Sequence, residues 1–279
     1  HRLNYKYINA ETRIPQPVIR TDAEAPHRPS TWEPALASAA EAVKRIAPNQ
    51  LAIIASGRMT NEELYMVRHL AAQIGTDMVD IVPRMGESDG MLISADRNPN
   101  TNGARLVLDI EPGSRLDAIR EGVRSGSVKG ILSLGEDLIS PEAGFTAEDL
   151  DKLDYLFMTA HSANETARHA DLVLPGVTYA EKFGTMINVT GRIQRLNRAI
   201  QPIGYARDDW QIFRDITLLL GGNPALKDFN SALDILTAMS TEYGALNGVS
   251  WGSIGDGGQP ILETGVTIPV VEREKNQGR

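Results

Sequence analysis

The sequence predicts an α/β fold with a doubly wound, mainly parallel sheet. Four short apolar runs are typical of strands that are buried on both faces: LAIIA at 51–55, GILSLG at 130–135, YLFMTA at 155–160 and DLVLPG at 171–176. Segments with apolar residues at helical spacing separate these runs, and turn formers punctuate them. Because strands that alternate with helices form parallel sheets, the order of these elements indicates the fold class.

Helix boundaries are marked by residues that satisfy free backbone groups. Ser30 with Glu33, and Thr60 with Glu63, match the capping-box pattern at the starts of two helices. Gly75 follows the apolar residues of the helix that starts at Thr60, and it is expected to end that helix in the left-handed conformation. The first half of the chain therefore contains a complete β-α-β unit, closed by a strand at 78–82.

The rest of the chain divides into further elements. Residues 83–104 show no sustained period and many turn formers, so we expect a long loop there. The other expected helices lie at 114–125, near 147–152, at 163–169, at 210–222 and at roughly 230–242. The predicted organisation has three parts, which are an extended N-terminal arm at 1–29, an α/β domain at 30–176, and a segment at 177–279 with an irregular β hairpin and C-terminal helices.

Composition excludes several classes of function. The chain has 279 residues, of which 42% are hydrophobic and 23% charged, as in ordinary globular proteins. Its net charge of −8 argues against nucleic-acid binding, and no apolar run is long enough for direct membrane insertion. The chain has no cysteine, which rules out disulfides, iron–sulfur ligation and a cysteine nucleophile within it. It begins at His1 without an initiator Met, so we expect a segment of a longer polypeptide.

Candidate binding residues follow the ends of the predicted parallel strands. Doubly wound sheets bind ligands beyond the carboxyl ends of their strands, which points to three places: Gly135-Glu136-Asp137, His161-Ser162-Ala163 and Pro175-Gly176. No nucleophile or carboxylate stands beside His161 in the sequence, which argues against a catalytic role for it. No dinucleotide-binding glycine motif follows a strand, and no P-loop occurs.

The predicted hairpin carries charges with two possible roles. Glu181-Lys182 and the pair Arg192 and Arg195 could neutralise a pyrophosphate. They could equally form ion pairs on a solvated hairpin, and spacing alone favours that ordinary interpretation.

The stretch ADLVLPGVTYAEKFGTMINVTGRIQRLNRAI, residues 170–200, resembles the molybdopterin oxidoreductase superfamily. The similarity is greatest to formate dehydrogenases and to the large iron–sulfur subunit of NADH–quinone oxidoreductase (complex I). The family run reads E-K-x-G-T-x-x-N-x-E-G-R-x-Q, and Thr190 stands here where Glu is usual. STWEPALASAAEAVKRI and SGRMTNEELYMVRHLAAQIGTDMVDIVPR also resemble family segments, so the likeness covers nearly the whole chain. If the pterin site is kept, the resemblance implies that these residues bind molybdopterin guanine dinucleotide: Gly135, Glu136, His161, Lys182, Thr185, Asn188, Arg192 and Gln194.

The departures from the family pattern concern the metal. The segment RMGES places Gly86 where catalytic members have the Cys or selenocysteine that ligates molybdenum or tungsten, and Glu87 where they have His. Glycine has no side chain to donate to a metal, and Glu87 does not supply a soft thiolate. Soon after Gly90 the chain continues into LISADRNPNTNGA, where family members hold a further α/β domain. The resemblance therefore implies a fold that lacks one α/β domain, with no metal or other cofactor in this segment.

Two functions follow from this resemblance. The favoured one is a non-catalytic C-terminal domain of a complex I-type NADH dehydrogenase large subunit, which supports an electron-transfer chain and has no active site of its own. Iron–sulfur clusters are then expected upstream or in partners, with a flavin/NADH-binding subunit and iron–sulfur subunits as partners, on the cytoplasmic side of the membrane. The alternative is part of a molybdenum or tungsten bis-pterin formate dehydrogenase. For the favoured function, the hairpin residues Thr185, Asn188, Arg192 and Gln194 are expected to bond backbone groups after strands 130–135 and 171–176.

Overall fold

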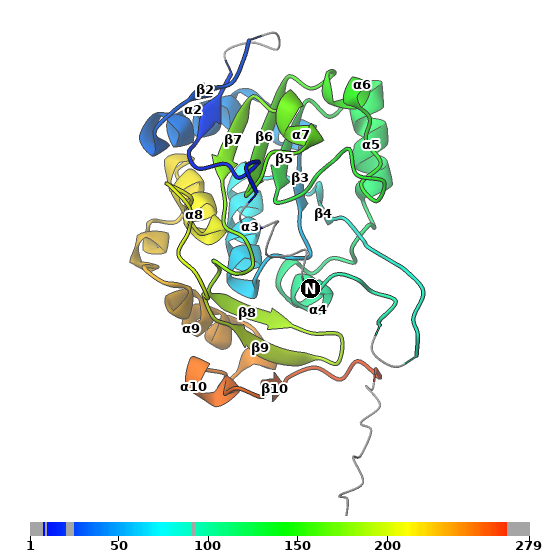
Figure 1. Ribbon diagram of the computed structural model, residues 1–279, viewed down its shortest axis with the longest axis vertical. Coiled ribbons are helices and arrows are strands. Elements are labelled where there is room, and N and C mark those ends of the chain that lie inside the picture. Colours follow the sequence, from blue (N-terminus) through cyan, green and yellow to red (C-terminus); the bar gives the residue numbers. More distant parts are fainter. Residues whose placement is uncertain (1–7, 9, 21–24, 91–92, 267–279) are drawn as a thin grey trace, which may run out of the picture.

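A computed structural model describes residues 8, 10–20, 25–90 and 93–266, and it contains two sheets (Figure 1). The larger sheet has seven strands in the order β2-β1-β7-β6-β5-β3-β4. Its parallel strands are β3 Leu51–Ala55, β4 Val79–Ile81, β5 Gly130–Leu134, β6 Tyr155–Ala160 and β7 Leu172–Pro175. The edge strands β1 Val18–Ile19 and β2 Arg28–Pro29 are antiparallel. The predicted doubly wound, mainly parallel α/β fold is confirmed.

Helices cover both faces of the parallel sheet, which explains why its central strands are apolar throughout. Alternate residues of β3 point to opposite sides: Ile53 belongs to the core beneath α2 Trp32–Arg45, α3 Asn61–Ile74 and α8 Asp209–Leu219. Its neighbour Ile54 belongs to the core beneath α5 Leu116–Ser125, α6 Ala147–Leu150 and α7 Glu165–His169. A strand with both faces in a core has no position for a solvated side chain.

Most of the remaining helices pack beside α3 or follow α8 along the chain. They are α4 Thr101–Leu108, α9 Ala232–Glu242 and α10 Trp251–Ile254, with the short 3₁₀ helices η1 Pro48–Gln50, η2 Pro224–Asp228 and η3 Gly244–Leu246. In the part of the chain that the structure describes, no helix combines the length and the apolar character needed to cross a bilayer.

The second sheet is the predicted hairpin with one added strand. The strands β8 Gly184–Ile187 and β9 Arg192–Leu196 pair antiparallel, separate from the parallel sheet, as predicted. The short strand β10 Gln259–Pro260 pairs with β9 as a third strand that the sequence did not predict. In Figure 1 this small sheet lies below α3 and beside α4. The contacts of β8 with both helices fix its position in the fold.

Two local predictions need correction, and two are confirmed. The Ser30–Glu33 capping box is wrong, because α2 starts after Thr31, whose side chain makes no capping bond. The expected loop at 83–104 ends earlier, because α4 begins at Thr101 and contacts α3. The Thr60–Glu63 capping box is present, and Gly75 ends α3 with a φ of 79°.

The described part of the arm at 1–29 is more than an extended segment. β1 pairs with β7 through Val18 and Val173, so the arm adds two antiparallel strands to the edge of the main sheet. Before β1 in the chain, Ile14 N–H donates to the carbonyl of His161 over 3.1 Å. These contacts attach the arm to the carboxyl ends of the parallel strands.

The threonines that precede α2 and α3 allow a matched test. Thr60→Ala should lower the free energy of unfolding by about 1–2 kcal/mol, because the Glu63 N–H loses its 3.2 Å acceptor. Thr31→Ala should change it by less than about 0.5 kcal/mol, because Thr31 is exposed and its side chain caps nothing. Urea unfolding of both variants measures the difference, and equal losses would contradict the assigned helix starts.

Candidate functional site

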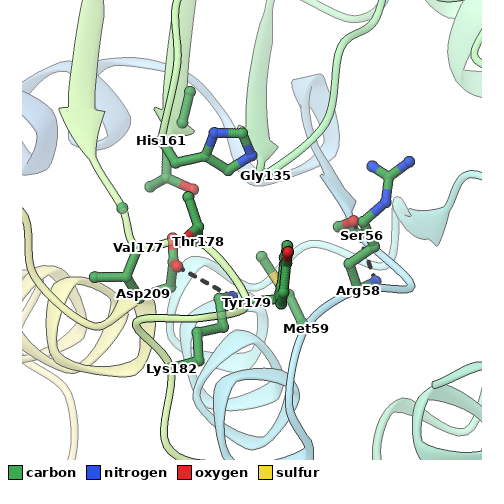
Figure 2. Close-up of a pocket in the computed structure, with 13 residues that line it drawn as sticks. Ser56, Arg58, Met59, Gly135, His161, Val177, Thr178, Tyr179, Lys182 and Asp209 are labelled. Carbon is green, nitrogen blue, oxygen red and sulfur yellow. Dashed lines mark hydrogen bonds and ion pairs between the residues drawn. The ribbon is translucent and has the colours of Figure 1, made fainter. Parts of the chain in front are cut away.

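A cavity of about 520 Å³ opens at the carboxyl ends of the parallel strands (Figure 2). Its lining includes Gly135, His161 and Lys182, all three of which the sequence placed in a binding site. Arg58 and Thr159 also line it, and the sequence analysis did not select them. Both the position and the volume are those of ligand sites in doubly wound sheets.

A buried cation forms part of the cavity wall. Lys182 Nζ lies 2.7 Å from Glu63 Oε2 and 3.3 Å from Asp209 Oδ2. Burial alone would lower the pKa of Lys182, but the two carboxylates more than offset this and hold the pKa above its usual value. Lys182 is therefore charged at neutral pH. This ion pair is buried, so the expectation of a solvated hairpin was wrong at this residue.

Two glutamates at the start of α3 are buried behind the cavity and the hairpin. Burial raises the pKa of Glu62 to about 7, although the hydrogen bonds from Thr185 act in the opposite direction and lower this pKa. Burial also raises the pKa of Glu63 to about 7; Lys182 lowers that pKa, and the nearby Asp209 carboxylate raises it again. Both carboxyl groups therefore change charge close to neutral pH.

The side chain of Thr185 is fully used within the protein. Its hydroxyl donates to Glu62 Oε1 over 2.8 Å and accepts from Asn61 Nδ2 over 2.9 Å. Its N–H donates to Glu62 Oε2 over 2.8 Å. On the same strand, Ile187 N–H donates to Asn100 Oδ1 over 2.7 Å. The hairpin is thus fixed to the starts of α3 and α4. The sequence analysis expected bonds to the loops after strands 130–135 and 171–176, and for Thr185 this expectation was wrong.

The other predicted hairpin residues lie away from the cavity. Asn188 Oδ1 accepts from the N–H groups of Thr190 and Arg192, and its amide nitrogen donates to Gln194 Oε1 over 2.9 Å. Arg192 donates to the carbonyl of Gly258 over 2.7 Å. Asn188 and Gln194 line a second, more open hollow of about 600 Å³ between the hairpin and the loop at 93–99. Of the predicted set, Gly135, His161 and Lys182 line the first cavity, Asn188 and Gln194 line the second hollow, and Glu136, Thr185 and Arg192 line neither.

The remaining charged residues of the sequence-based set are also paired within the protein. Glu136 is buried and accepts two bonds from Arg84, at 2.9 and 2.5 Å. Glu181 forms a buried ion pair with Arg13 of the arm at 2.7 Å, so its predicted solvated pairing was wrong. Arg195 forms an ion pair with the exposed carboxylate of Asp256, which is the ordinary surface pairing that spacing favoured.

Two groups at the cavity, Thr159 and Arg58, have no side-chain partner among the described residues, and a third group, His161, is uncharged. Thr159 is fully buried, and its hydroxyl has no hydrogen-bond partner among the described residues. Arg58 is exposed at the rim, and its guanidinium makes no hydrogen bond or ion pair that the described residues show. Burial lowers the pKa of His161 to about 4, helped by the positive charges of Arg13 and Lys182, so its imidazole is neutral. Sequence reasoning missed Thr159 because it lies inside the apolar run YLFMTA.

Sequence comparisons show which known proteins this chain is similar to. Residues 97–217 match the family described as "Molybdopterin oxidoreductase". The matched segment is similar to that family over less than half of the chain, from the loop before α4 into α8. A formate dehydrogenase-like protein of Staphylococcus haemolyticus is 32% identical over 144 residues, which cover 51% of this chain and 15% of that protein. NADPH-Fe(3+) oxidoreductase subunit alpha of Geobacter sulfurreducens is 34% identical over 136 residues, which cover 48% of this chain and 16% of that protein.

A solved structure shows the same fold over most of the chain. The acetylene hydratase from Pelobacter acetylenicus superposes with a TM-score of 0.60, covering 89% of this chain and 66% of that one, at 9% sequence identity. At that identity the likeness concerns the fold alone. The matches to the relatives span only 15% and 16% of those proteins' lengths, so the chain corresponds to a small part of each.

The residues of this chain do not fit a molybdenum or tungsten centre. Gly86 is exposed, and a side chain there would start 2.8 Å from the guanidinium of Arg97. The chain has no cysteine, and its described residues bring together no group of three His, Asp or Glu that could hold a metal. The cavity instead presents the polar side chains of Arg58, Thr159 and Lys182.

The buried glutamates predict an unusual pH dependence of stability. A carboxyl group whose pKa is raised from 4.5 to about 7 by folding binds its proton more tightly in the folded state. Its contribution to stability is therefore complete below about pH 4.5 and is lost as the pH rises through about 7. For Glu62 the loss amounts to roughly 3 kcal/mol at most.

Urea unfolding at about pH 5, 6 and 7 tests this prediction on Glu62→Gln, whose stability should fall less with pH than that of the wild type. Glu111→Gln is the control, because Arg105 lowers the pKa of this more exposed carboxyl, so its titration lies below the tested range. Parallel curves for the wild type and Glu62→Gln would contradict the assigned burial.

Proposed function

We propose that this chain is the non-catalytic, molybdopterin-oxidoreductase-like part of a complex I-type NADH dehydrogenase large subunit. The observation that carries the proposal is the loop after β4, where the position of the family's metal ligand is the exposed Gly86, packed beside Arg97. A position without a side chain supplies no thiolate or other side-chain ligand. In this function the domain supports iron–sulfur clusters that lie upstream or in partner subunits.

The internal bonding of the hairpin suits a supporting role. Thr185, Asn188 and Arg192 are bonded to groups of the protein itself, so the hairpin keeps its position without a ligand. A sheet buried on both faces and a hairpin fixed to α3 give a rigid body against which clusters and subunits can pack. The Geobacter relative supports the electron-transfer class, because its name joins NADPH to an iron acceptor.

Partners and location follow from this function and belong to the same proposal. A flavin/NADH-binding subunit would deliver electrons to iron–sulfur subunits, and the domain would pack against that chain of carriers. The complex would lie on the cytoplasmic side of the membrane.

A second candidate is part of a molybdenum or tungsten bis-pterin formate dehydrogenase. The observation that favours it is the 520 Å³ cavity with the unpartnered hydroxyl of Thr159 in its wall. Arg58, Thr159 and Lys182 would hold the nucleotide part of one pterin, and a partner chain would complete the metal site. The bound group would supply two-electron redox chemistry, while these residues would bind and orient it. The formate dehydrogenase-like relative supports this candidate.

Gly86→Ala separates the two candidates at the metal position. The variant should keep NADH-driven turnover of the enzyme, assembled with its native partners, within about twofold of the wild type. The new methyl group displaces only the exposed guanidinium end of Arg97, and no ligand is lost.

Elemental analysis of the same assembled enzyme is the companion measurement. Molybdenum and tungsten should be absent at stoichiometric levels, while iron from the clusters should be present. A tenfold or greater fall in turnover for an intact Gly86→Ala complex, or one molybdenum or tungsten per complex, would reject the non-catalytic function in favour of the second candidate.

A further inference from the structure

The hollow of about 600 Å³ between the hairpin and the loop at 93–99 has an apolar wall. Two parts of the chain that are distant in sequence supply its apolar side chains, which are Ile93, Pro99, Met186, Val189 and Leu196. Ile93 is 47% exposed, and Met186, Val189 and Leu196 are only half-buried. Contact of such a surface with water costs free energy, so the wall is stabilised when another segment covers it.

The alternation of side chains along the hairpin places this wall on its outer face. Thr185 and Ile187 are buried on the face toward α3 and α4. Met186 pairs with Gln194 across the ladder, and both line the hollow. The outer face therefore carries apolar residues that belong to neither core.

The C-terminal part of the chain runs beside this hollow. After β10, the N–H groups of Ile261 and Leu262 donate to the carbonyl of Gly191, at the turn of the hairpin, over 3.0 and 3.1 Å. Thr264 Oγ1 then donates to the carbonyl of Val189, which belongs to the wall, over 3.0 Å. In Figure 1 the coil after β10 follows the hairpin toward its turn. Each further residue extends the chain by at most about 3.6 Å, so a few residues are enough to reach across the wall.

The sequence continues with TIPVVEREKNQGR at 267–279, which lies outside the described residues. Apolar residues stand at every second position from the last described residue onward, and acidic residues continue the alternation: Val266, Ile268, Val270, Glu272 and Glu274. An extended chain places every second side chain on the same side. One side of this segment would therefore present apolar groups first and carboxylates next.

The hollow has a cation for such a carboxylate. Arg97 lines it and is exposed, and no described residue forms an ion pair with this guanidinium. Arg195 also lines the hollow, but Asp256 already pairs with it. Asp96 is the acidic residue of the wall, and its carboxylate accepts the N–H of Asn98 over 2.9 Å. Arg97 is thus the charge that an incoming carboxylate would meet.

We propose that residues 267–274 bind in this hollow as an extended segment of the same chain. Its apolar positions, Ile268 and Val270, cover the wall. Glu272 then lies beside Arg97. A ligand or a partner protein reaches the outer face of the hairpin only after this segment is displaced, so the contact is autoinhibitory. This inference goes beyond the supporting role proposed above and does not rest on it.

The chain has no cysteine, so a single introduced thiol reports whether the hollow is covered. Gln194→Cys places that thiol in the wall and leaves the apolar side chains unchanged. Deletion of residues 267–279 from this variant should raise its rate of alkylation by N-ethylmaleimide about tenfold, as expected for a segment bound about 90% of the time. Leu219→Cys on α8, which is 46% exposed and outside the lining of the hollow, is the control, and its rate should not change with the deletion.

Two point variants make the same chemical change on opposite sides of the segment. In the Gln194→Cys background, Val270→Ser should speed alkylation about threefold or more, because an apolar group leaves the wall. Val271→Ser should leave the rate unchanged, because the alternation turns this side chain away from the wall. These variants answer the question even if the truncated chain is unstable.

The same reaction separates the occupants. Protection that is independent of protein concentration supports binding within one chain, and so does slower alkylation of the truncated chain when the peptide TIPVVEREKNQGR is added. Protection that disappears on dilution would overturn the proposal, because the segment would then come from a second copy. Equal rates with and without residues 267–279, or equal effects of Val270→Ser and Val271→Ser, would also overturn it.

Discussion

The first turn of α3 contains two neighbouring glutamates that are both buried and point to different partners. Glu62 accepts from the N–H and the hydroxyl of Thr185, whereas Glu63 accepts from Thr60 and Lys182. A buried carboxylate without such donors costs several kcal/mol, so each glutamate requires its partner to stay in place. Because Thr185 and Lys182 both lie on the hairpin segment, this constraint determines where the hairpin packs on the parallel sheet.

The same constraint explains why the hairpin residues that resemble the family pattern bond to other groups of the protein. The hairpin residues of the molybdopterin oxidoreductase pattern are present, yet Thr185 is bonded to α3, and Asn188 and Arg192 are bonded within the small sheet and its third strand. Only Lys182 among them reaches the cavity at the strand ends. A retained motif is therefore compatible with the supporting role proposed above.

Sequence patterns predicted the features that depend on local physics. The strand LAIIA, the capping box of Thr60 with Glu63 and the left-handed Gly75 each follow from residues close in the chain, and the structure has all three. The start of α4 was missed, because Asn100 is fixed by Asn61 and by Ile187, residues distant in sequence. Likewise, Thr185 lies 123 residues from Glu62, and no local pattern shows such a pairing. Among the candidate site residues, Gly135, His161 and Lys182 were selected by strand ends and motif, whereas Thr159 inside an apolar strand gave no signal.

A double-mutant cycle between Glu62 and Thr185 tests most directly whether the carboxylate of α3 holds the hairpin. Glu62→Gln, Thr185→Val and the double variant would be unfolded in urea at about pH 8, where Glu62 is ionised. The account predicts a coupling free energy of about 1–3 kcal/mol, because either single change leaves buried polar groups without their partners. Losses that add to within roughly 0.5 kcal/mol would show that the two side chains act independently, and would contradict the account.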